Sequence, residues 1–241
     1  MKERLRRIKN PLTFIILLIA IPATVILGSI MFKEKYYAWI SMCVAVMSCL
    51  PIFYCFEKKG GFSSEENSSA ELVVLSVLIA LSVLGRFVFS WLPGFKPVTA
   101  ITIITGVWLG KEAGFMVGSL SAVISNFYFG QGPWTPFQMF AWGFIGLITG
   151  LLANLLRKNK AFICIYGAIA GVFFSALMDV WTTLWAEGGF NLNRYIVTIV
   201  SSLPITIEYA ISNVIFLYFL TKPIGDKLIR LKKKYGLFIT K

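Results

Sequence analysis

Three ionisable side chains lie inside long apolar stretches of the sequence: Arg86, Asp179 and Glu208. A charged group in the hydrocarbon of a bilayer is costly, so such residues usually face a cavity, a substrate or one another. They are therefore candidate ligand contacts. The alternative interpretation is a structural ion pair between Arg86 and one of the two carboxylates.

Aromatic and amide side chains gather near the predicted outer ends of the apolar stretches. An apolar, aromatic cavity with a few polar groups is typical of a site for a small planar ligand, although tryptophan also anchors helices at membrane interfaces. Combined with the ionisable residues, they give the predicted substrate-binding set: Arg86, Lys96, Asn126, Tyr128, Gln131, Trp134, Asp179, Trp185 and Glu208.

The stretch 129–139, FGQGPWTPFQM, carries two glycines and two prolines between apolar runs. Thr135 has the residue type of an N-cap, with proline after it and Gln138 at the third helical position, a pattern typical of a capping box. We therefore predict a helix start at Thr135. The preceding loop is predicted to turn Gln131 and Trp134 toward the ligand.

No motif for catalysis or metal binding is found. The chain has no histidine, and its four cysteines form no CxxC pair. A lysine at 111 between glycines lacks the spacing of a nucleotide-binding P-loop. The sequence predicts no catalytic residue, no metal ligand and no cofactor, and an enzyme is disfavoured.

The composition is that of a polytopic membrane protein. Of 241 residues, 57% are hydrophobic and 14% charged, against about 25% charged in soluble domains, and the mean hydropathy is +0.77. Apolar runs predict an all-α bundle with eight spans, at 11–32, 36–56, 71–91, 97–110, 114–129, 136–156, 161–184 and 195–219.

The predicted organisation has four parts. A two-helix membrane extension (1–60) precedes a polar cytoplasmic linker (61–70), a six-helix substrate-binding domain (71–220) and a basic cytoplasmic tail (221–241). Most of the 23 lysines and arginines fall on one side of these spans, which predicts a multi-pass protein of the bacterial cytoplasmic membrane with both termini in the cytoplasm. The net charge of +12 is then explained by topology and lipid headgroups rather than by nucleic acid.

The stretches 86–106, 114–126 and 129–139 together resemble the substrate-binding S components of energy-coupling factor (ECF) transporters, over about residues 70–220. The resemblance implies a six-helix subunit that captures a vitamin at its outer face. It then docks on a transmembrane coupling subunit and topples, powered by two cytoplasmic ATPase subunits. By the same resemblance, Ser76 and Ala80 form the small-residue motif that meets the coupling subunit. The two helices before the core depart from the usual pattern.

The substrate is less defined. The motifs resemble S components for cobalamin or its benzimidazole riboside precursors, while riboflavin or a thiamine precursor fit the same residue types. A stand-alone channel or secondary transporter for a small planar metabolite, and a scaffold role, are the alternatives from other classes.

Overall fold

The computed structural model describes residues 43–44 and 65–238, and the predicted N-terminal pair of helices lies outside these residues. The described part contains helices and no strand, so the all-α prediction is confirmed. In chain order the helices are α3 (Glu65–Val88), α4 (Val98–Leu109), α5 (Lys111–Phe129), α6 (Thr135–Leu151), α7 (Ala153–Leu156), α8 (Lys160–Glu187) and α9 (Leu192–Tyr235).

Each of the six predicted core spans falls on a helix, but two boundaries differ. Helix α3 already begins at Glu65, within the stretch predicted as a linker, and α9 continues through the predicted tail to Tyr235. Three lysines in the last turn of α9 suit the helix dipole, which favours helix there.

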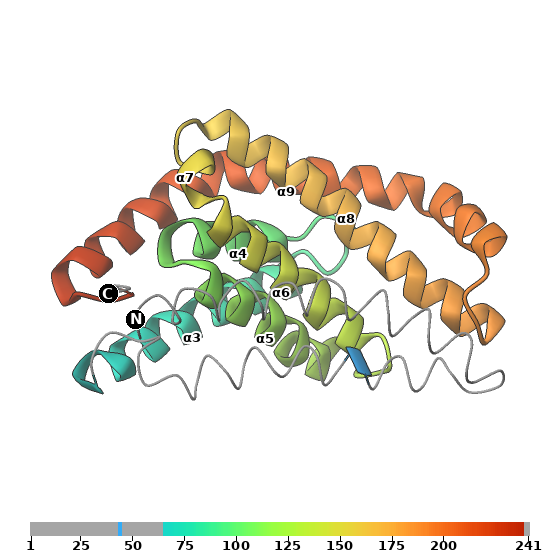
Figure 1. Cartoon of the computed structure of the whole chain (residues 1–241), viewed down its shortest axis with the longest axis horizontal. Coiled ribbons are helices and arrows are strands. Elements are labelled where there is room, and N and C mark those ends of the chain that lie inside the picture. Colours follow the sequence, from blue (N-terminus) through green and yellow to red (C-terminus); the bar gives the residue numbers. More distant parts are fainter. Residues whose placement is uncertain (1–42, 45–64, 239–241) are drawn as a thin grey trace, which may run out of the picture.

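Helices α8 and α9 form a long antiparallel pair joined by a short turn, and they lie along one side of the molecule in Figure 1. Helices α4, α5 and α6 occupy the middle, and α3 packs on α5 and α4 at the other side. Within residues 65–238, three helices are long and apolar enough to cross a membrane: α3 from Ser69, α8 and α9.

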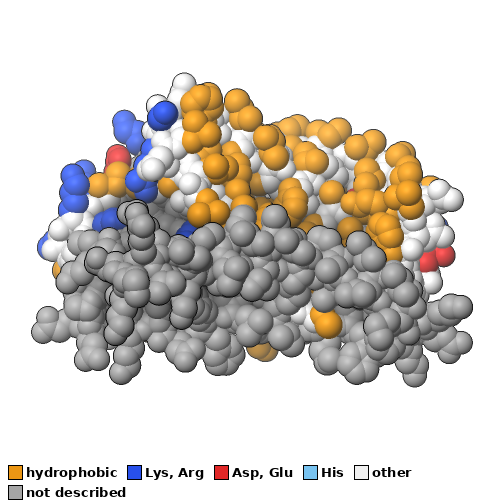
Figure 2. Space-filling model, viewed as in Figure 1, with side chains coloured by type: hydrophobic (Ala, Val, Ile, Leu, Met, Phe, Trp, Pro, Cys, Tyr) orange, Lys and Arg blue, Asp and Glu red, His pale blue; other side chains and the backbone are white. Residues whose placement is uncertain are grey.

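Apolar side chains cover the visible outer face of α8 and α9, as Figure 2 shows. Examples are Ile169 on α8, 60% exposed, and Ile207 on α9, 56% exposed. Lysine and arginine side chains gather at the end that holds α7 and the C-terminal part of α9. A surface with an apolar belt and one basic end is what a membrane-spanning bundle requires.

Helix α4 is the centre of the bundle. All its residues except Trp108 are buried, because α3, α5, α6 and α9 all pack against it. Its 12 residues span roughly 18 Å, too short to cross about 30 Å of hydrocarbon. A short helix is tolerated here because protein rather than lipid surrounds it.

Glycines bring α5 and α6 into backbone contact. A Cβ atom added to Gly114 would lie 2.5 Å from the carbonyl oxygen of Gly146, and one on Gly118 would lie 2.4 Å from that of Trp142. These glycines thus allow the close packing of α5 on α6.

We expect Gly146→Ala to destabilise the fold by about 1–3 kcal/mol, because the new methyl group would lie 2.2 Å from the Gly114 oxygen. The exposed substitution Ile124→Ala on α5 is the control. Thermal unfolding of the detergent-solubilised chain measures the difference. Equal midpoints for both variants would contradict the close packing.

Candidate functional site

The guanidinium of Arg86 is buried at the C-terminal end of α3, with the residue only 6% exposed. Its Nη1 donates to Ser125 Oγ and, at 2.8 Å, to Asn126 Oδ1 on α5. The guanidinium carbon lies 4.6 Å from the centre of the Phe129 ring and 5.3 Å from that of Trp142. The cation is therefore held between α5 and α6 by neutral acceptors and aromatic faces.

One donor of this guanidinium has no partner. Arg86 Nε is buried and makes no hydrogen bond to any described residue. A buried unsatisfied donor costs about 1–3 kcal/mol, more when charged. An acceptor supplied by a ligand would remove this cost.

Asn126 extends the network into the loop between α5 and α6. Its Nδ2 donates to Thr135 Oγ1 and to Gln138 Oε1, both at 2.9 Å. The Thr135 hydroxyl donates to Gln131 Oε1 at 3.0 Å, and Gln131 Nε2 donates to the Val123 carbonyl at 2.8 Å. The loop is thereby fastened to the same polar network that holds Arg86.

The predicted capping box is wrong. The N-cap of α6 is Trp134, in a helical conformation, and no side chain caps the helix. The amide of Gln138 bonds to the Trp134 carbonyl. The N-cap is therefore one residue earlier than predicted, and Thr135 is the first helical residue. Thr135 and Gln138 are thus free of the capping role, and both bind Asn126 instead.

Lys96 interacts electrostatically with both Arg86 and Glu208. The backbone amide of Lys96, in the loop between α3 and α4, donates to Ser212 Oγ of α9 at 3.0 Å. Burial and the nearby charge of Arg86 lower the pKa of the Lys96 amine to about 8, and Glu208 opposes this shift. The Glu208 side chain lies against Gly94, where an added Cβ would be 2.9 Å from Glu208 Cβ.

Aromatic rings outside the predicted substrate-binding set lie close to Arg86. Trp142 stacks on Phe174 with ring centres 4.7 Å apart and planes at 11°, and Phe174 meets Tyr209 edge-on at 5.2 Å. The Trp142 indole donates to Thr99 Oγ1 at 3.2 Å. One spacing points to these rings: Trp142 follows Gln138 by four residues, one helical turn.

We call Arg86, Lys96, Asn126, Trp142 and Glu208 the central cluster. Its members come from α3, the loop after it, α5, α6 and α9. The arrangement offers cationic donors, one carboxylate and stacked aromatic faces. Groups of these kinds can bind the face and the polar edge of a planar ring.

Asp179 lies in a second place, between α8 and α9. The residue is 7% exposed, and its Oδ2 accepts a hydrogen bond from Ser202 at 2.6 Å. Across residues 65–238, Arg86 forms no ion pair with Asp179 or Glu208; the ion pair found there joins Arg194 to Glu187 at 3.5 Å. The alternative of a structural pair with Arg86 is thus not realised in this structure.

Three other predicted residues lie apart from the central cluster. Trp134 packs on the aromatic group of Phe137, Phe140 and Trp181, while Tyr128 and Trp185 are 69% and 59% exposed. Tyr128 contacts the Phe129 ring at 5.0 Å and Trp185 contacts Trp181 at 5.7 Å. Trp134 and Trp185 thus contact buried aromatic residues, whereas the Phe129 ring beside Tyr128 is half-buried.

The electrostatic coupling gives a test of the cluster. We expect acetic anhydride labelling of Lys96, followed by peptide mass spectrometry, to rise with a midpoint near pH 8. Glu208→Gln removes a charge that favours the protonated amine, so its midpoint should fall below that of the wild type. Exposed Lys158 is the internal reference. A midpoint that Glu208→Gln leaves unchanged would contradict the proximity of these groups.

Comparison with known proteins places this arrangement in a family. The UPF0397 proteins of Aliivibrio fischeri strains MJ11 and ES114 are 26% identical over 139 residues, covering 50% of this chain and 74% of each relative. A UPF0397 protein of Aliivibrio salmonicida is 28% identical over 138 residues, with the same shares covered. No solved structure matches.

The family match covers more of the chain than these relatives do. Residues 66–235, which run from the first turn of α3 to the end of α9, match the profile of the family described as ECF-type riboflavin transporter, S component. The match confirms the predicted S component of a transporter and does not single out a cobalamin type. The chain therefore belongs to the family of ECF-type riboflavin transporter S components.

Proposed function

We propose that this chain captures a planar vitamin at the central cluster and passes it inward as the S component of an ECF importer. The observation that carries the proposal is the buried Arg86 guanidinium with its unpartnered Nε beside the stacked Trp142 and Phe174 rings. A ligand with a flat aromatic ring and a polar edge supplies both a stacking face and the missing acceptor.

Riboflavin is the substrate that we propose first. Its fused ring system carries carbonyl and nitrogen acceptors for Arg86 and Lys96, and its ribityl hydroxyls can donate to Glu208. The description of the family supports this choice. The sequence also predicted benzimidazole ribosides, which are cobalamin precursors, as ligands. They share a fused ring and a sugar with riboflavin, so they are the second ligands to compare. Cobalamin and thiamine follow them.

The polar network around Asn126 has a positioning role in this proposal. It fixes Arg86 from the α5 side and fastens the 130–134 loop through Thr135 and Gln131. A ligand that accepts from Arg86 would meet a donor already oriented, which reduces the entropy lost on binding. Gln131 then acts through the loop, and the exposed Tyr128 and Trp185 are contacts only for a ligand that reaches the surface.

We propose α3 as the surface that meets the coupling subunit. Ser76 and Ala80 are exposed one turn apart, on the same helix as the exposed side chains of Val73 and Val77. The Ser76 hydroxyl donates to the Leu72 carbonyl at 2.8 Å, so it can enter an apolar interface without losing a hydrogen bond to water. Small residues at this spacing allow close approach of a partner helix.

Binding of riboflavin to the purified full chain, followed by quenching of flavin fluorescence, tests the substrate site. We expect Arg86→Lys and Glu208→Gln each to weaken binding by about tenfold or more, because each removes a hydrogen bond involving a charged group. The matched control is Glu187→Gln, which removes a carboxylate that lies away from the central cluster and pairs with Arg194.

Two results would count against the site. If Glu187→Gln weakens binding as much as Glu208→Gln, the central cluster has no special role. If the wild type binds a benzimidazole riboside or cobalamin tightly and riboflavin weakly, the fold and site stand but the proposed substrate is wrong.

Replacing Ser76 and Ala80 together by tryptophan tests the docking surface. We expect loss of copurification with the coupling subunit and loss of ATP-dependent uptake, with riboflavin binding retained, because the bulky rings block close helix approach. The control is tryptophan at Ile165 and Ile169, an exposed pair at the same spacing on α8. Ion-driven uptake by this chain alone in liposomes would instead support a stand-alone transporter.

A further inference from the structure

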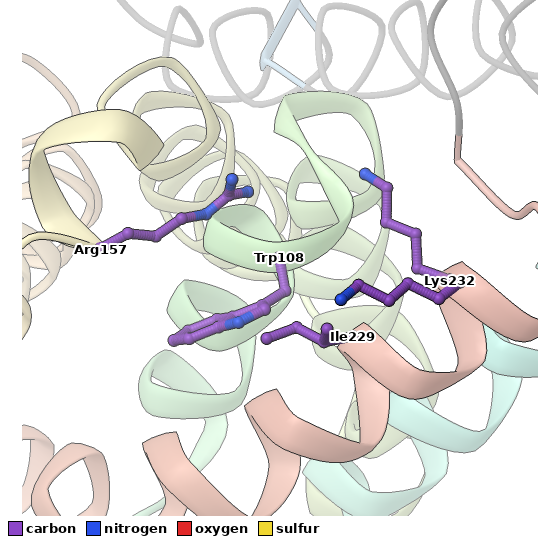
Figure 3. A pocket seen from close by; sticks show the side chains of 5 residues that line it. Trp108, Arg157, Ile229 and Lys232 are labelled. Atoms are coloured by element: carbon purple, nitrogen blue, oxygen red, sulfur yellow. The ribbon is translucent and has the colours of Figure 1, made fainter.

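A hollow of about 410 Å³ lies at the basic end of the bundle and is not part of the proposed substrate site. It is lined by Trp108 of α4, by Arg157 just after α7, and by Ile229, Lys232 and Lys233 of α9. Figure 3 shows Arg157, Trp108, Ile229 and Lys232 around it. We call it the basic pocket.

The walls of the basic pocket are held in place by contacts between distant segments. Arg157 donates from Nε to the Val107 carbonyl at 2.9 Å, and its Nη2 bonds to the same oxygen. An added Cβ on Gly225 would lie 2.9 Å from the Trp108 ring, so this indole rests directly on the α9 backbone. The two bonds use one edge of the Arg157 guanidinium and leave Nη1 for another acceptor.

The described charges that line the pocket are of one sign. Among the residues that the structure describes, its lining holds three cations and no carboxylate. Arg157 and Lys232 repel each other across it, and Glu71 is the carboxylate that interacts with Lys232. Glu71 is fully buried and accepts a hydrogen bond from the backbone amide of Phe238. A bound anion would offset the repulsion among the cations.

The depth of the pocket suits a lipid headgroup. The apolar segment of α3 begins at Ser69, and Glu71, two residues further on, is close enough to interact with Lys232. Helix α9 has 44 residues, so at about 1.5 Å per residue it extends well beyond a hydrocarbon core of about 30 Å. The lysines in its last turn therefore lie outside the hydrocarbon, and the electrostatic interaction of Lys232 with Glu71 places them beside the start of the apolar segment of α3.

We infer that the basic pocket binds the phosphate group of an anionic phospholipid. Arg157 Nη1, Lys232 and Lys233 supply donors for the phosphate, and Trp108 and Ile229 supply an apolar wall for the glycerol and the start of the acyl chains. Basic pockets between membrane helices commonly bind acidic headgroups. A soluble phosphate ester presents the same chemistry to the three cations, so the experiment must separate the two sources.

Native mass spectrometry of the full chain in detergent, titrated with dioleoyl phosphatidylglycerol, tests this inference. We expect Lys232→Gln with Lys233→Gln to weaken lipid binding by about tenfold or more. The control pair, Lys158→Gln with Lys234→Gln, removes the same charge next to the pocket in sequence but outside its lining, and should change binding less than about twofold on the same basis.

A second readout is independent of mass spectrometry. Phosphatidylglycerol should change the tryptophan emission of the wild type and much less that of Trp108→Phe. Excess glycerol 1-phosphate distinguishes the sources: lipid binding that survives it identifies a lipid site, whereas displacement identifies a site for soluble phosphate esters.

Three outcomes would overturn the inference. Equal weakening by both lysine pairs would show a diffuse surface charge rather than a site. Equal affinity for phosphatidylcholine and phosphatidylglycerol would show that the anionic headgroup is not recognised. If Lys232→Gln with Lys233→Gln leaves lipid binding unchanged but abolishes association with the coupling subunit, the pocket binds a protein partner instead.

Discussion

The burial of one guanidinium constrains much of the end of the bundle that holds the C-terminus of α3. Arg86 ends α3 in an apolar environment, and a cation there is stable only if neutral acceptors and aromatic faces surround it. Ser125 and Asn126 on α5, and Phe129 and Trp142 on α5 and α6, meet that need. Three helices and the 130–134 loop are thereby fixed relative to one side chain.

The hydrogen bonds that hold Arg86 also couple ligand binding to the 130–134 loop. Asn126 holds Arg86 with its oxygen and Thr135 with its nitrogen, so the loop before α6 cannot move far without altering the site. The glycine contacts between α5 and α6 add rigidity just below, because their backbones touch where side chains would otherwise keep them apart. A rigid α5–α6 pair with the 130–134 loop attached to it suits a subunit that captures a ligand.

The sequence predicted the helices well because long apolar runs bounded by Gly, Pro and charges leave few alternatives in a membrane. It also selected Arg86, Lys96, Asn126 and Glu208, which the structure brings together, because ionisable or amide groups in apolar segments need partners. It failed on Thr135, where the motif fits an N-cap but tertiary bonds to Asn126 and Gln131 prevail.

The aromatic members of the cluster could not be separated by sequence alone. Trp142 and Phe174 lie outside the predicted substrate-binding set, since their stacking depends on the packing of α6 on α8. Tyr128, Trp134 and Trp185 were equally aromatic, but the structure places them outside the central cluster. Helix propensity and apolar patterning say which face of a helix is buried, and they do not say which rings on different helices meet.

Mass spectrometry of the small molecule that copurifies with the chain is the sharpest test of a planar ligand bound at Arg86. We predict an equimolar planar heterocycle, a flavin in the first instance, retained by the wild type and lost from Arg86→Lys under the same washing. A chain that purifies without such a molecule and binds none on reconstitution would contradict it. So would a ligand that Arg86→Lys retains as firmly as the wild type.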